Sequence, residues 1–88
     1  MDNYSEILNI VVEETGYEEL RTNQDIDLIA NDIIDSLAFI NLIDRLSIDF
    51  NIEIQPTEVT ADSWRTVKNI TQMVNELISK TAKEKPLL

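Results

Sequence analysis

Apolar residues recur at helical spacing along three stretches of the chain. The first stretch predicts a helix over residues 3–15, which Asn3 is expected to cap and which Gly16 is expected to end in a left-handed conformation. Its apolar face consists of Tyr4, Ile7, Leu8, Val11 and Val12. The last stretch predicts a helix that Thr66 caps. Its apolar face consists of Val67, Ile70, Met73, Val74, Leu77 and Ile78.

The middle stretch predicts a helix over residues 36–50. Its apolar residues recur at steps of three and four: Leu37, Phe39, Ile40, Leu42, Ile43, Leu46 and Phe50. These are more apolar residues than one buried face needs, so some of Leu37, Ile40 and Ile43 must be exposed. An exposed apolar patch on this helix would suit the docking of a partner.

The segments between these helices are of unequal length. Residues 17–35 form a long first loop, whose scattered apolar residues are expected to pin it to the core. Residues 51–54 are expected to be extended, and Pro56 indicates the start of a short fourth helix with Trp64 pointing into the core. We therefore expect an all-α fold, a small four-helix bundle of three longer helices and one short helix. The bundle is expected to form one domain over residues 1–80, followed by a flexible tail over residues 81–88.

The charge of the chain is strongly negative and unevenly distributed. The formal net charge is −10, and residues 1–35 hold ten acidic residues against the single base Arg21. Nucleic acids and anionic membrane surfaces are therefore unsuitable partners, whereas basic protein surfaces are complementary. There is no apolar run long enough to cross a membrane and no secretory signal pattern, so we expect a cytoplasmic protein.

The residue types that most often perform catalysis are missing. The chain contains no cysteine and no histidine, which argues against an enzyme and against a cysteine or histidine metal site. The acidic residues from Asp25 onward are spaced somewhat like a calcium-binding loop. However, Ala30 and Ser36 stand where that loop needs its glycine and its closing glutamate, so we expect no metal site.

The start of the middle helix is the most informative position. Asp35 is suited to accept hydrogen bonds from the first backbone N–H groups, and Ser36 lies in the first turn beside the positive end of the helix dipole. An anion attached to the Ser36 hydroxyl would be stabilised there.

The motif Asp35-Ser36-Leu37, followed by apolar residues at four-residue steps, resembles the acyl and peptidyl carrier proteins. These apolar residues are Leu42, Leu46, Phe50 and Ile54. The resemblance spans roughly residues 7–78, and it implies that Ser36 carries a covalent 4′-phosphopantetheine arm. Many members have glycine before the aspartate. This chain has Ile34 there instead, and the resulting Ile-Asp-Ser form of the motif is similar to that of the D-alanyl carrier proteins.

The resemblance implies a carrier that presents acyl or aminoacyl groups as thioesters to the enzymes of a dedicated biosynthetic pathway. The implied partners are a phosphopantetheinyl transferase, an acyl- or aminoacyl-loading ligase and downstream acyl-using enzymes, with the carrier acting as a monomer. Partner contacts are expected at Asp35, Leu37, Ile40 and Asp44. The alternative is a small acidic helical interaction module without a prosthetic group.

Overall fold

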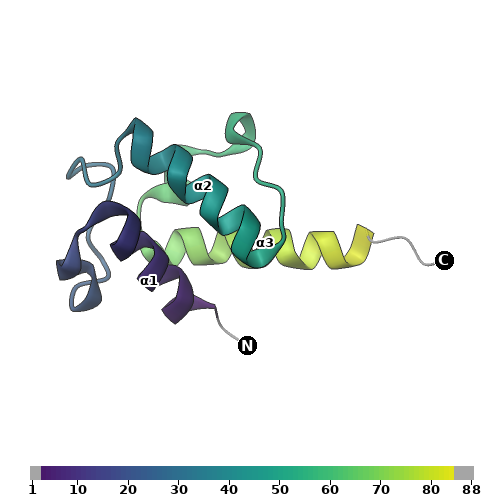
Figure 1. Ribbon diagram of the computed structural model, residues 1–88, viewed down its shortest axis with the longest axis horizontal. Helices are drawn as coiled ribbons and strands as arrows, with labels where there is room; N and C mark the ends of the chain where they lie inside the picture. The colour runs from purple at the N-terminus through teal and green to yellow at the C-terminus, as the bar shows by residue number, and fades with distance from the viewer. Residues whose placement is uncertain (1–2, 85–88) are drawn as a thin grey trace.

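The computed structural model describes residues 3–84, and for Glu58 and residues 81–84 it describes the backbone alone. Within that range the chain is helical and contains no strand, with α1 over Tyr4–Thr15, α2 over Ser36–Phe50 and α3 over Val67–Glu84. Figure 1 shows α3 as the longest helix, with α1 and α2 running obliquely to it. α1 packs against both of the other helices. No helix within residues 3–84 combines the length and the apolarity that a membrane crossing needs.

The three predicted helices are confirmed, and local chemistry explains where α1 and α2 end and where α3 begins. Gly16 ends α1 with a φ of 74°, and its N–H donates to the carbonyl of Val12. Asn51 ends α2 in the same left-handed conformation, with a φ of 54°. Asparagine tolerates this conformation better than most residues. The predicted cap at Thr66 is also confirmed, because its Oγ1 accepts a hydrogen bond from the N–H of Asn69 at 3.1 Å.

The short fourth helix is not confirmed. The segment forms two 3₁₀ helices instead, η2 over Pro56–Glu58 and η3 over Ala61–Trp64. Val59 and Thr60 between them have extended backbones, with ψ angles of 128° and 156°. Both residues are β-branched, and the Thr60 hydroxyl accepts from the N–H of Ser63, so a new cap forms where an α-helix would have to continue.

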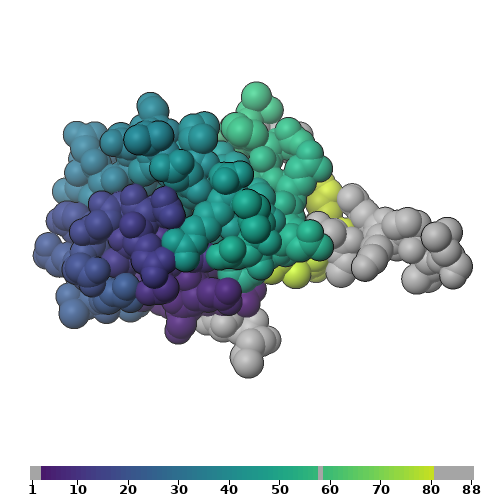
Figure 2. All heavy atoms as spheres, viewed as in Figure 1, coloured from purple at the N-terminus to yellow at the C-terminus, as the bar shows by residue number. Residues whose placement is uncertain are grey.

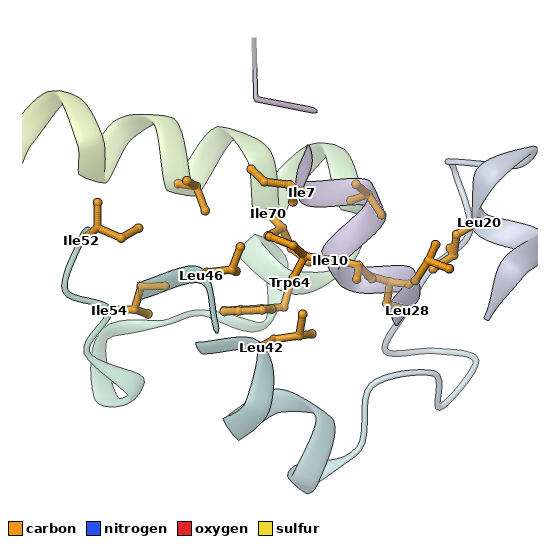
Figure 3. Close-up of a cluster of buried hydrophobic side chains, with 14 residues drawn as sticks. Ile7, Ile10, Leu20, Leu28, Leu42, Leu46, Ile52, Ile54, Trp64 and Ile70 are labelled. Atoms are coloured by element: carbon orange, nitrogen blue, oxygen red, sulfur yellow. The ribbon is translucent and has the colours of Figure 1, made fainter. Parts of the chain in front are cut away.

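One apolar core contains side chains from α1, α2, α3, η3 and the loops between them. Figure 3 shows Trp64 in the same cluster as side chains from all three long helices. The buried apolar residues are Ile7, Ile10, Val11, Val12, Leu20, Leu28, Ala38, Leu42, Leu46, Ile52, Ile54, Trp64, Val67, Ile70 and Val74. The expected core position of Trp64 is therefore confirmed, and Leu20 and Leu28 pin the long first loop as predicted. This loop also contains η1, over Glu18–Arg21.

The last helix, α3, extends into the segment for which the sequence predicts a tail. The backbone of α3 is helical through Glu84, so the first part of the tail expected over residues 81–88 continues the helix. The last four residues of this predicted tail, 85–88, lie outside the described residues.

Candidate functional site

Ser36 is the first residue of α2, and its side chain is exposed. The cap predicted at Asp35 is confirmed, because its Oδ1 accepts from the N–H of Ala38 at 2.8 Å. The first intrahelical backbone bond runs from the N–H of Phe39 to the carbonyl of Asp35, at 2.9 Å. Helix geometry therefore gives the N–H groups of Ser36 and Leu37 no intrahelical acceptor. An exposed hydroxyl thus lies beside free donors at the positive end of the helix.

The loop that leads to Ser36 is tied to the core through Leu28. This side chain is fully buried, and its N–H donates to the carbonyl of Arg65 at 2.6 Å. The N–H groups of Ile33 and Ile34 both donate to the carbonyl of Leu28, at 2.9 and 3.3 Å. The residues just before Asp35 are therefore fixed relative to the core, which fixes the start of α2.

Asp27 holds the same loop from its polar side. Its Oδ1 accepts from the N–H groups of Ile29 and Ala30, at 3.0 and 2.8 Å, and its Oδ2 lies 3.3 Å from Nη1 of Arg65. The hydrogen bond from Ala30, followed by that from Ile29 and the charge of Arg65, lowers the pKa of the Asp27 carboxyl. Among the side chains that the structure describes, no group of three or more acidic residues is placed to hold a metal ion.

A groove of about 300 Å³ lies directly beside Ser36. Its lining residues are Ile29, Ile34, Asp35, Ser36, Phe39, Val59, Thr60, Ala61 and Trp64. The indole of Trp64 packs edge-on against Phe39, with ring centroids 5.1 Å apart and ring planes at 68°. In Figure 2 the segment around η2 and η3, drawn in green, projects from the body of the molecule next to α2. The groove thus lies between the start of α2 and this segment.

The side of α2 that faces away from the core carries a line of apolar residues. Leu37, Ile40 and Ile48 are 70%, 54% and 70% exposed, and Asp44 lies exposed between Ile40 and Ile48. Their spacing places these four residues on one face, which we call the outer face, opposite the buried Leu42. Three of the four residues expected to contact partners therefore lie together.

Asp35, the fourth of these residues, lies at the helix start and lines the groove instead of joining the outer face. Ile48 was missed by the sequence prediction. Its position four residues after Asp44 was the available signal, but a wide apolar stripe does not reveal which of its members face the solvent.

Arg45 is the only basic residue of α2, and it faces α1. Its Nη1 lies 2.6 Å from Glu13 and 3.2 Å from Glu14, while its Nε lies 3.6 Å from Asp49. The hydrogen bond with Glu13 raises the pKa of Arg45 and lowers the pKa of Glu13. The outer face is consequently apolar and acidic, with no cation of α2 exposed on it.

The family described as phosphopantetheine attachment site matches residues 5–74 of this chain. The D-alanyl carrier protein of Bacillus licheniformis is 32% identical over 77 residues, which cover 88% of this chain and 99% of the relative. The D-alanyl carrier protein of Enterococcus faecalis is 34% identical over 71 residues, covering 81% of this chain and 91% of the relative. The one from Lactococcus lactis subsp. lactis is also 34% identical, covering 81% and 90% respectively. The chain therefore belongs to the phosphopantetheine attachment site family: it is a carrier protein that holds 4′-phosphopantetheine covalently, and it is not itself an enzyme.

Proposed function

We propose that the prosthetic group is attached to Ser36 and that the carrier bears a small aminoacyl group on it as a thioester. The observation that carries this proposal is the exposed Ser36 hydroxyl, held at the start of α2 by the capped and core-anchored segment before it. A hydroxyl in this position is open to a transferase on one side and lies beside the groove on the other.

The residues around Ser36 fit a phosphodiester on its Oγ. The free N–H groups of Ser36 and Leu37 point a partial positive charge toward such an anion. When bound, phosphopantetheine supplies the thiol that this cysteine-free chain lacks. The carboxylate of Asp35 accepts a hydrogen bond from the N–H of Ala38, and this bond holds the carboxylate in place beside the attachment point.

Two observations support a small aminoacyl cargo. The relatives that match over most of this chain are named D-alanyl carrier proteins. In addition, Trp64 is only 2% exposed and packs against Phe39, so the indole fills the space into which a long acyl chain would have to enter. Opening a packed core has a substantial free-energy cost, whereas a small group can remain outside it.

We further propose that the carrier works as a monomer in the cytoplasm, with its functional domain within residues 1–80. Carriers of this family work with transferases and loading ligases in general. Here the expected partners are a phosphopantetheinyl transferase, an aminoacyl-loading ligase and an enzyme that accepts the aminoacyl group. The apolar and acidic outer face of α2 is complementary to a partner surface with an apolar patch and a basic rim.

The attachment site is tested by changing Ser36 to alanine. The wild-type chain, incubated with coenzyme A and a phosphopantetheinyl transferase, should gain the mass of one arm, whereas Ser36→Ala should stay unmodified and melt normally. Ser5→Ala is the matched control, because Ser5 is also exposed in a first helical turn but follows no aspartate. An arm on Ser36→Ala, or none on the wild type, would refute the assignment.

The cargo class is tested by loading the arm with alanyl and with long fatty acyl groups. Alanyl loading should leave the amide NMR signals of the core and the melting temperature almost unchanged, and so should a long chain, because Trp64 blocks its entry. If long chains instead raise the melting temperature and shift the signals around Trp64, the protein sequesters them and the small-cargo proposal is wrong.

A further inference from the structure

The indole N–H of Trp64 is an unpartnered donor in the interior. Its Nε1 is buried and has no acceptor among the residues that the structure describes. An indole nitrogen can only donate, and a buried tryptophan usually finds an acceptor for it. The buried hydroxyl of Thr71 shows the ordinary situation, because it donates to the carbonyl of Val67 at 2.8 Å. Among the residues that the structure describes, Nε1 therefore lacks an acceptor, and a ligand bound beside Trp64 can supply one.

This unpartnered donor belongs to a residue that lines the groove beside Ser36. The apolar part of the groove comes from side chains such as Phe39 and Val59. A flexible chain attached to the Ser36 Oγ would begin at the edge of the groove, since Ser36 is exposed and is one of the lining residues. A ligand that combines apolar groups with a hydrogen-bond acceptor would satisfy both kinds of surface.

We propose that the groove binds the pantetheine part of the arm and that Trp64 Nε1 donates a hydrogen bond to one of its amide carbonyl oxygens. The inference rests on the proposed attachment at Ser36. The arm carries amide carbonyls and a dimethyl-substituted carbon, which suit the single donor and the apolar wall. Trp64 would thus position the arm along the surface while its ring stays in the core.

The binding requires a small movement of one wall of the groove, because Nε1 is covered. One wall is formed by Val59, Thr60 and Ala61, and its Val59 end has the weaker backbone contact. The N–H of Val59 reaches the carbonyl of Pro56 at 3.4 Å, which is a long hydrogen bond, and the backbone between η2 and η3 is extended. The amide signals of these three residues are therefore expected to respond when the arm is added.

The test uses the indole signal, which is unique because the chain contains one tryptophan. The apo protein is converted to the holo form with its free thiol, and intact mass confirms that each molecule carries the arm. The indole proton should then move downfield in the ¹H–¹⁵N spectrum and exchange with solvent about fivefold more slowly, the factor that one net hydrogen bond corresponds to. The amides of residues 59–61 should shift in the same sample.

Two variants complete the experiment. Trp64→Phe keeps an aromatic ring in the core but removes the donor, so the arm should shift the amides of residues 59–61 much less than in the wild type. Ser36→Ala treated in the same way should show no shift at all. A gain of mass with an unmoved indole signal overturns this inference and leaves the attachment at Ser36 intact. If the indole signal shifts only after alanyl loading, the acceptor belongs to the cargo and not to the pantetheine, and this result also overturns the inference. No gain of mass removes the proposed function, and this inference with it.

Discussion

Asp35 contributes to both the stability of α2 and the electrostatics of the attachment point. Its Oδ1 caps the helix through the N–H of Ala38, and its charge lies next to Ser36. Asp35→Ala is expected to destabilise the protein by about 1 kcal/mol, the usual loss for a helix N-cap. The same change should slow transfer of the arm to Ser36, because the nearest acid is gone. Chemical denaturation and a mass-based transfer assay measure the two effects.

Asp35→Asn separates the two contributions. Asparagine caps helices about as well as aspartate, so this variant should keep nearly full stability while it still loses the charge. If Asp35→Ala has the same stability as the wild type and receives the arm at the same rate, Asp35 contributes neither to the helix cap nor to arm transfer.

Single residues also mark the limit of what the sequence can predict. The cap at Asp35 was predictable because it depends on residues three positions apart. The cap expected at Asn3 was wrong, because its side chain makes no capping hydrogen bond and donates instead to Oδ1 of Asn75, at 2.8 Å. That partner is 72 residues away, so no local pattern could reveal the competition.

At the scale of elements, the outer face of α2 is expected to matter for partners and not for the fold. Leu37→Ala and Ile48→Ala remove exposed side chains, so each should change the free energy of unfolding by less than about 0.5 kcal/mol. Each should nevertheless lower kcat/KM of the loading ligase toward the carrier, since apolar contact area is lost in the complex. Ligase kinetics with variant carriers measure this effect.

Leu46→Ala is the contrasting variant on the same helix. Leu46 is fully buried, so its truncation should cost about 2–5 kcal/mol of stability. Loading kinetics that are unchanged by Leu37→Ala and Ile48→Ala together would show that partners dock elsewhere.

The elements differ in how far the sequence could predict them. The bounds of α2 agreed with the prediction because its apolar period, its Asp35 cap and the residues that end it all favour one helix. The segment over residues 55–64 was mispredicted, since the choice between an α-helix and 3₁₀ turns depends on the extended backbone at Val59 and Thr60 and on where Trp64 is buried. The groove beside Ser36 depends on the same segment, so it was not predictable either.

For the molecule as a whole, the excess of acidic residues is expected to oppose folding. Several acidic side chains within residues 1–35 do form ion pairs, but these pairs are partly exposed and contribute little. The chain as a whole still carries a net charge of −10, with 17 acidic residues against 7 basic ones. The melting temperature should therefore rise between low and moderate salt, because screening relieves the self-repulsion. Thermal denaturation in a NaCl series measures this.

A divalent salt distinguishes screening from binding. MgCl₂ should raise the melting temperature no more than NaCl does at the same ionic strength, because no cluster of three acids among the described side chains is placed to hold a metal. A melting temperature that stays flat or falls with NaCl would contradict the repulsion argument.

The inward direction of Arg45 has a consequence for how such a carrier can diversify. The ion pairs between α1 and α2 lie on one side of the helix, in the cluster of Arg45 with Glu13 and Glu14, while the exposed charge of the outer face, Asp44, lies on another. If partners dock on the outer face as proposed, a substitution at Asp44 changes which enzymes recognise the carrier without disturbing the contact between the helices. On the same proposal, duplicated copies of this scaffold could acquire separate sets of client enzymes, and a matched reversal of charge on carrier and enzyme would be a direct route to an insulated pair.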